Sequence, residues 1–252
     1  MDTANNHINS DKTTLEAKPS FNLIKIFWYF IILSIIGLII ETFFCYATTG
    51  ILESRKGLLL GPFCPIYGVG GTILIVLLEK YKNSYIKLFI YGSILGDAIE
   101  YILSFILEAM YGNRFWEYSY INLNLNGRIC ITYTIFWGIL SIILIKSIKP
   151  FIDNIILKIH KKTKNFKIKN IVEILLLTFL IIDCILTIWG VSIYTNRATD
   201  TYYNKNIDVK YKNSLIVNFE EMLFSNEYMK KTFPNLRFIN NYGDEIFVRD
   251  IL

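Results

Sequence analysis

The sequence YIKLFIYGSILGDAIEYILSFILEAM occupies residues 85–110 and combines the length of a membrane span with one polar face. A helix that crosses the hydrocarbon core of a bilayer needs about 20 mostly apolar residues. At about 100° per residue, six polar side chains fall within roughly 60° of the direction of Asp97. They are Ser93, Asp97, Glu100, Tyr101, Ser104 and Glu108. A charge at bilayer depth must face protein or water, so we expect this acidic face to line the inside of a helix bundle.

Two interpretations remain for the acids of this face. Asp97 and Glu100 can line a functional cavity, or they can pair with arginine or stay neutral in a packed interior. For Glu108, which lies near the end of the segment, pairing with arginine is the simpler expectation.

Four further apolar segments accompany this one, at residues 26–46, 57–78, 129–145 and 171–194. The chain of 252 residues is 53% hydrophobic and only 19% charged, which excludes an ordinary soluble globule and a disordered chain. The predicted fold is all-α: a polytopic membrane helix bundle of about five transmembrane segments with a small polar C-terminal tail. Because glycines and prolines interrupt segment 57–78, a re-entrant loop followed by a helix is the alternative to a fifth span.

The positions of lysine and arginine predict the orientation of the bundle. The basic loop 146–170 holds eight lysines and one acid, Asp153, so we expect it in the cytoplasm. Alternation of five spans then places the N-terminus inside and the C-terminus outside. With the C-terminal tail left aside, fourteen basic residues lie inside and four outside.

The segments around the transmembrane domain (24–194) carry weaker signals. Residues 1–23 are predicted to form a disordered cytoplasmic tail, since no secretory signal is visible. Residues 151–160 predict a helix that lies on the inner membrane surface, with docking of a cytoplasmic partner as the alternative. The tail 195–252 is expected outside the cytoplasm. It begins with a linker at 195–209 and contains an amphipathic helix from Leu215 to Leu223, capped by Asn213 or Ser214.

On this topology several unusual residues share one depth in the outer half of the bundle. Glu41 lies in the first segment and Arg128 opens the fourth. We therefore expect a polar pocket lined by Glu41, Asp97, Glu100 and Arg128, in which Arg128 is the countercharge of Glu41 or Glu100. Asp183 in the fifth segment either joins this pocket or is hydrogen-bonded separately.

The stretch GPFCPIYG at residues 61–68 is the strongest local signature. Its two prolines remove two backbone donors, and its glycines permit non-helical angles. At membrane depth such a backbone survives only where it is buried in protein or lines water. We expect it to add Pro62, Cys64 and Tyr67 to the solute-binding pocket. The alternative is a surface loop before an ordinary helix start near Pro65.

Other chemical signatures are weak. The aromatic loop RFWEYSY at 114–120 predicts an interfacial belt, with a lid over the pocket as the alternative. The four cysteines form no C-x-x-C pair and are expected to be small buried thiols. His7 and His160 lie far from the acids, and no P-loop is present. We therefore predict no catalytic residue, no metal and no cofactor.

Four motifs in order carry a family resemblance: LGPFCPIYG at 60–68, Glu100-Tyr101, WEYS at 116–119 and NGRIC at 126–130. This set resembles the bacterial membrane family named Putative ABC-transporter type IV, over about residues 27–150. Glu117 stands where aspartate is expected, and the tail matches only at 233–236. The resemblance implies an integral, multi-pass permease subunit of the bacterial plasma membrane. It carries over no substrate and no catalytic residue.

The first hypothesis is a permease-like protein that binds a small solute in the polar pocket. Its energy would come from a separate ATP-binding subunit or from proton coupling at the acids, and a homodimer or a partner subunit would complete the pathway. The lipid bilayer is a partner and nucleic acid is not. The alternatives are a membrane-embedded enzyme that acts on a lipid or envelope precursor, and a non-transporting sensor or structural protein.

Overall fold

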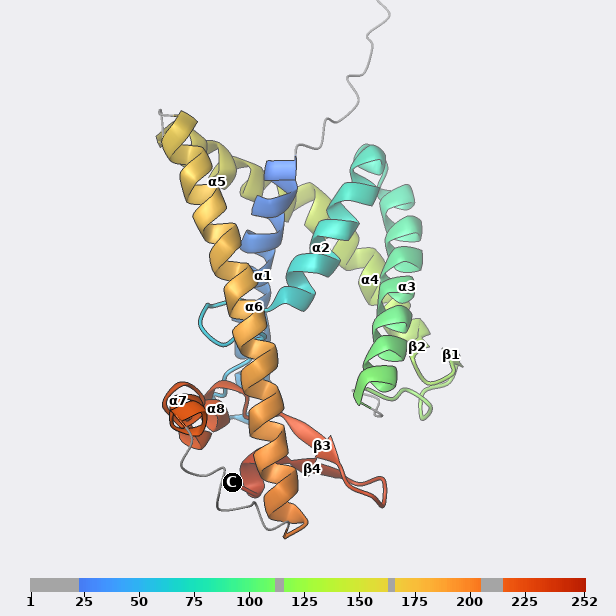
Figure 1. Ribbon diagram of the computed structural model, residues 1–252. Coiled ribbons are helices and arrows are strands. Elements are labelled where there is room, and N and C mark those ends of the chain that lie inside the picture. The colour runs from blue at the N-terminus through green and yellow to red at the C-terminus, as the bar shows by residue number, and fades with distance from the viewer. Residues whose placement is uncertain (1–22, 112–115, 163–165, 205–214) are drawn as a thin grey trace, which may run out of the picture.

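The computed structural model describes residues 23–111, 116–162, 166–204 and 215–252. These residues form a helical bundle with a small lobe at one end (Figure 1). Three sequence predictions lie outside the described residues: the tail that precedes residue 23, Arg114 and Phe115 of the aromatic loop, and the helix caps Asn213 and Ser214.

Four helices of the described chain are long and apolar enough to cross a membrane. They lie at Leu23–Thr49 (α1), Tyr85–Ile106 within α3 (Tyr85–Tyr111), Ile131–Lys162, and Lys167–Tyr202 within α6 (Phe166–Tyr202). The predicted count of five is not confirmed, because segment 57–78 contains only the 14-residue helix α2 (Pro65–Leu78). At 1.5 Å per residue α2 is about 21 Å long, shorter than a hydrocarbon core of about 30 Å.

The chain nevertheless changes end with every segment (Figure 1). α1 runs away from the end that holds α5 (Lys149–Lys162), and the non-helical stretch 51–64 leads back to α2, which begins near mid-height. The 3-10 turn Glu79–Tyr81 then joins α2 to α3, which runs antiparallel to α4 (Ile131–Ile143). The start of α1, this turn and α5 therefore share one end, here called the α5 end. The stretch 51–64 and the short helix α2 together return the chain to the α5 end.

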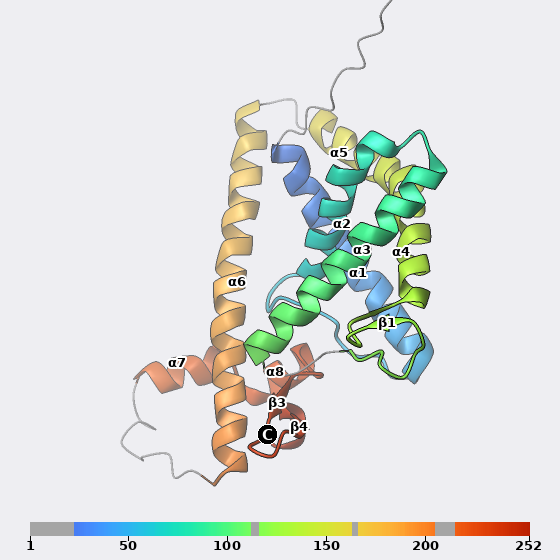
Figure 2. The same ribbon diagram turned by 90° about the vertical axis from the view of Figure 1, so that its right-hand side faces the viewer.

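α4 and α5 are joined by a π-helical turn, Leu144–Ile148. Pro150 follows two residues after this turn, and its ring nitrogen cannot donate to the carbonyl of Lys146 four residues earlier. A proline at this place favours a local widening of the helix and a change of direction. α5 consequently turns across the end of the bundle (Figure 2).

The main core lies at the α5 end. It includes Trp28 and Tyr29 of α1, Ile75 of α2, Leu88 of α3 and Ile152 of α5. Because Ile152 and Ile156 are buried in this core, the apolar stripe of α5 packs against protein. The predicted helix is confirmed, but the prediction that its stripe faces lipid is wrong for these residues; Phe151 remains exposed.

A C-terminal lobe, residues 215–252, packs against the last turns of α6. It contains α7 (Leu215–Leu223), α8 (Asn226–Thr232), the antiparallel pair β3 (Arg237–Ile239) and β4 (Glu245–Phe247), and the 3-10 turn Val248–Asp250. Tyr194 and Ala198 of α6 are fully buried in the lobe core with Phe224 and Met229. The predicted linker is therefore wrong up to residue 202, because this packing keeps α6 helical to Tyr202. The predicted helix at 215–223 is confirmed.

Candidate functional site

The polar face of α3 packs against α4 and the loop before it. Residues 116–130 form this loop, which ends in the short antiparallel pair β1 (Asn124–Leu125) and β2 (Ile129–Cys130). All six predicted polar residues of α3 have a partner there. The hydrogen bonds join Ser93 to Thr134, Asp97 to Thr134, Glu100 to Tyr118 and Trp137, Tyr101 to Asn126, and Ser104 and Glu108 to Arg128. The periodicity of the sequence thus identified the inward face correctly.

Glu100 is a buried acid with both oxygens occupied. Its Oε1 accepts the phenol of Tyr118 at 2.9 Å, and its Oε2 accepts the indole N–H of Trp137 at 2.9 Å. Only 8% of the residue is exposed. Both donors are neutral, so they orient the carboxyl group without neutralising it.

Asp97 lies one turn away and is less completely satisfied. Its Oδ2 accepts the hydroxyl of Thr134 at 2.7 Å, while its buried Oδ1 has no hydrogen-bond partner among the described residues. In the same part of the chain neither Asp97 nor Glu100 forms an ion pair with a lysine or arginine. A buried acceptor without a partner is uncommon and marks a position that a ligand donor or water can fill.

A shallow groove of about 310 Å³ adjoins Asp97. Its walls come from α3 and from the β1–β2 loop: Asp97, Ala98, Tyr101, Ile102, Leu125 and Ile129. The surface that it offers is apolar, because the buried Asp97 Oδ1 is not exposed in it. Small-molecule sites typically combine such apolar walls with a few polar groups, and Asp97 is the acid in this lining.

Arg128 is buried, but it does not form an ion pair with Glu41 or Glu100, the acids that the sequence suggested. Its guanidinium donates to Ser104 Oγ at 2.9 Å and pairs with Glu108, and it lies 5.7 Å from the ring centroids of Tyr101 and Phe105. The prediction that Arg128 is the countercharge of Glu41 or Glu100 is therefore wrong. The simpler expectation for Glu108, pairing with arginine, is confirmed.

The loop 116–130 is fastened over this face by its own hydrogen bonds. Tyr118 N–H donates to the Gly127 carbonyl at 2.8 Å, and the Trp116 indole donates to the Arg128 carbonyl at 3.0 Å. Gly127 has a φ of +67°, and a Cβ there would overlap the carboxylate of Glu117. Burial and the neighbouring Glu100 carboxylate raise the pKa of Tyr118, so its phenol remains a hydrogen-bond donor.

The broken stretch before α2 is held by α6. Asp183, which is fully buried, accepts the backbone N–H groups of Leu60 at 2.9 Å and Gly61 at 3.1 Å. Thr187 Oγ1 accepts the N–H of Leu59 at 2.9 Å. Asp183 thus supplies backbone partners that an extended segment lacks at this depth.

The remaining predicted site residues belong to the pair α1 and α2. The buried Cys64 donates its backbone N–H to Ser34 at 3.1 Å, Pro62 is exposed, and the Tyr67 phenol donates to Glu41 at 2.5 Å. These hydrogen bonds place Glu41 and Tyr67 in one group, whereas Asp97, Glu100 and Arg128 bond to partners on α3, α4 and the loop between them. No contact between the two groups is found within the described residues.

A network of charged residues lies at the α5 end, and it was not predicted from the sequence. Lys149, 9% exposed, contacts Glu79 at 3.2 Å and Asp153 at 2.8 Å. Asp153 also contacts Lys25 at 3.0 Å and accepts the Tyr29 phenol at 2.6 Å. The available signal was the i, i+4 spacing of Lys149 and Asp153, the single acid of the basic loop. The network connects α1, the end of α2 and α5.

Comparison with protein families identified one matching model, described as Putative ABC-transporter type IV, over residues 28–188. The match covers α1 to α6 up to Ile188 and includes both groups of polar residues. Comparisons with curated proteins and with solved structures gave no significant match.

Proposed function

Because this chain belongs to the Putative ABC-transporter type IV family, we propose that it is a permease-like membrane subunit that binds a small solute at Asp97 and Glu100. The solute would carry a cationic or strongly hydrogen-bond-donating group, which Asp97 Oδ1 can accept. Tyr101, Leu125 and Ile129 would contact its apolar part. The observation that carries this proposal is the buried Asp97 Oδ1, which has no hydrogen-bond partner in the described part of the chain, in a residue that adjoins a groove of about 310 Å³.

The other predicted site residues have supporting roles in this proposal. Arg128 holds the loop 116–130 against α3 through Ser104 and Glu108. A second polar position lies on the neighbouring helix pair. It is formed by Glu41 and Tyr67, together with Pro62 and Cys64 just before α2. A solute that moves between the two helix pairs would meet both positions.

The proposed location is a bacterial plasma membrane, with the α5 end in the cytoplasm. The described lysines of residues 146–162 and 166–170 gather at this end together with Lys25, Lys80 and Lys82, as the positive-inside rule requires. The N-terminus is then inside, and the C-terminal lobe lies outside the cytoplasm.

A separate ATP-binding subunit is the proposed source of energy, since the sequence carries no P-loop of its own. The exposed lysines of α5 would face such a subunit. Because four spanning helices and one short helix are few for a transport pathway, a homodimer or a second membrane subunit would complete it.

A thermal-shift screen tests the proposed binding site. Full-length protein in detergent is heated with a panel of amine-, guanidinium- and hydroxyl-bearing solutes. We expect a stabilising solute whose effect disappears in Asp97→Asn and persists in Glu41→Gln. A solute that stabilises Asp97→Asn as strongly as the wild type would refute the assignment. If Glu100→Gln and Asp97→Asn change only stability and leave transport intact, the acids are structural.

A further inference from the structure

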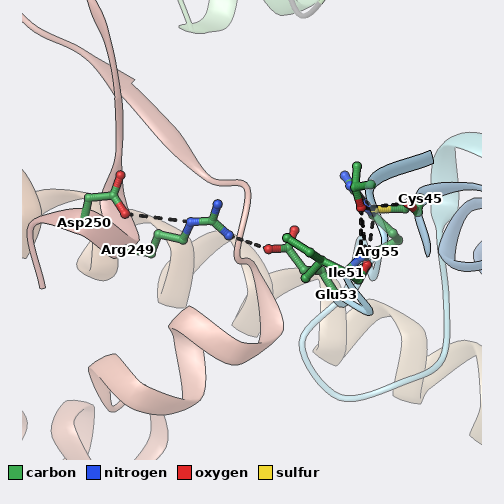
Figure 3. A network of polar contacts seen from close by, with 7 residues as sticks. Cys45, Ile51, Glu53, Arg55, Arg249 and Asp250 are labelled. Carbon is green, nitrogen blue, oxygen red and sulfur yellow. Dashed lines mark hydrogen bonds and ion pairs between the residues drawn. The ribbon is translucent and has the colours of Figure 1, made fainter. Parts of the chain in front are cut away.

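Arg55, in the non-helical stretch between α1 and α2, has an unusual environment for a half-buried arginine. Its Nη2 donates to the Sγ of Cys45 (Figure 3), and its buried Nε has no hydrogen-bond partner among the described residues. A thiol is a weak acceptor, so it leaves the guanidinium charge uncompensated. A desolvated cation of this kind normally pairs with a carboxylate or phosphate.

The acids closest to Arg55 in the chain and in space are engaged elsewhere. Glu53 accepts the Arg249 guanidinium at 2.6 Å, on the side of the C-terminal lobe (Figure 3). Glu41, one turn before Cys45, accepts the Tyr67 phenol. The neighbouring half-buried side chain is Lys56, which adds a second positive charge. Glu53 and Glu41 keep their negative charges, but among the described residues neither forms an ion pair with Arg55, so a bound anion would be its first direct anionic partner.

An apolar groove begins beside this cation. It has a volume of about 360 Å³ and lies between α1 and the beginning of the non-helical stretch 51–64. The groove is lined by Leu38, Ile39, Thr42, Phe43, Tyr46 and Leu52. Cys45, which Arg55 contacts, directly precedes Tyr46, and the Cys45 thiol also contacts the Ile51 carbonyl, next to Leu52. A cation and an apolar trough thus meet at one point.

The depth of this point matches the boundary between acyl chains and head groups. From Leu23 to Cys45 the helix rises about 33 Å at 1.5 Å per residue, close to the thickness of a hydrocarbon core. Arg55 then lies where a phospholipid carries its phosphate, and the groove runs from there toward the membrane interior.

We propose that Arg55 and the α1 groove form a binding site for one anionic phospholipid. The phosphate accepts hydrogen bonds from the Arg55 guanidinium, and one acyl chain lies along Phe43, Tyr46 and Leu52. Zwitterionic lipids can fill the groove as well, but they bring no net negative charge to Arg55 and Lys56. This site is separate from the solute position at Asp97.

Native mass spectrometry of the full-length protein in detergent tests the proposal. The probes are dioleoylphosphatidylglycerol and dioleoylphosphatidylcholine, which share acyl chains and differ in net charge. We expect at least roughly tenfold stronger retention of phosphatidylglycerol by the wild type. Arg55→Gln should abolish this preference, and Arg237→Gln, which removes an arginine of the C-terminal lobe, should preserve it. Leu52→Asn should weaken the retention of both lipids.

Three results would overturn the proposal. Equal retention of the two lipids by the wild type would mean that the groove holds ordinary boundary lipid. A preference that survives in Arg55→Gln would place the selectivity elsewhere. Full displacement of phosphatidylglycerol by millimolar inorganic phosphate would mean that Arg55 binds a free anion. Arg55→Lys keeps the positive charge and should retain part of the preference for phosphatidylglycerol. It replaces Arg55→Gln as the test variant if Arg55→Gln does not fold.

Discussion

Asp183 and Leu60 are 123 residues apart in the chain, yet the Asp183 carboxylate accepts the Leu60 N–H at 2.9 Å. Together with Gly61 and Thr187, this contact fixes the non-helical stretch before α2 against α6. The broken backbone is thus buried in protein, one of the two conditions under which it persists at membrane depth. The sequence left open whether Asp183 joins the polar pocket or is hydrogen-bonded separately, and these contacts favour the second interpretation.

Asp183→Asn should weaken this anchor. An amide offers one acceptor oxygen in place of two, and its NH₂ group would face a backbone N–H. We expect a loss of about 1–3 kcal/mol, which lowers the melting temperature in detergent by a few degrees. Cys184→Ser, at the exposed neighbouring position, is the matched control and should leave the melting temperature unchanged. Equal melting temperatures for Asp183→Asn and wild type would show that the anchor is dispensable.

Gly68 and Gly70 of α2 offer a comparison within one helix. A Cβ at Gly68 would overlap Ser34 Oγ and the Phe30 carbonyl of α1, whereas a Cβ at Gly70 meets nothing within 4 Å. Gly68→Ala should therefore force α1 and α2 apart at a cost of about 1–3 kcal/mol. Gly70→Ala should be neutral or stabilise by up to about 1 kcal/mol, because alanine favours the helix. Thermal melts of the two variants check this, and the reverse order would contradict the packing described.

Tyr118→Phe should destabilise the α3–α4 pair. It removes one of the two donors to the buried Glu100 and leaves Oε1 without that partner. The expected loss is about 1–3 kcal/mol, typical of an unsatisfied buried acceptor. Tyr120→Phe removes the same hydroxyl from a side chain that is 81% exposed, so it should have no effect. Melting temperatures measured side by side distinguish the two; matching losses would argue against a specific role for Tyr118.

Lys149→Met should be the most damaging of the lysine substitutions in α5. Lys149 is buried and contacts both Glu79 and Asp153, so its removal leaves two acids without their shared cation. Because Asp153 keeps Lys25 and Glu79 keeps Lys82 as partners, the expected loss is about 1–3 kcal/mol. Lys158→Met, on the exposed side of the same helix, should be tolerated. Expression yield and thermal stability measure the difference between Lys149→Met and Lys158→Met. Both variants lose one positive charge, so loss of charge alone would affect them equally.

The contact between Glu53 and Arg249 predicts a pH dependence. The hydrogen bond from Arg249 lowers the pKa of Glu53 below its ordinary value of 4.5. Its contribution to stability is therefore complete above about pH 4.5 and is lost as the pH falls through the lowered pKa. At pH 7 the wild type should exceed Glu53→Gln by about 0.5–1 kcal/mol. Melts between pH 7 and pH 3 should show the two proteins converging toward the acid end; a constant difference would exclude this linkage.

The sequence predicted those features that depend on local periodicity. The spacing of Asp97, Glu100 and Glu108 identified the inward face of α3, because a helix repeats every 3.6 residues wherever it lies. The prolines at 62 and 65 likewise marked the place where a continuous spanning helix is interrupted. The Asn213 or Ser214 cap and the Arg114 side of the aromatic loop fall outside the described residues.

What the sequence could not supply was the choice of partner between distant residues. Arg128 had several acids at a similar depth, and its pairing with Glu108 depends on how the loop 116–130 folds back on α3. Ala198 resembles part of a polar linker until it is seen in one core with Phe224 and Met229. Lys149 is one of eight lysines in its loop and differs from them only in its tertiary surroundings.

The anchoring of the stretch 58–61 by α6 also has a consequence for biosynthesis. Leu60 and Gly61 leave the ribosome more than 120 residues before Asp183, which at about 5–20 residues per second is a delay of roughly 6–25 s. Throughout this interval their N–H groups need water or the insertion machinery as temporary partners. The half-length helix α2 can therefore reach its final position only after α6 has entered the membrane, so this bundle completes its assembly from its last helix backward.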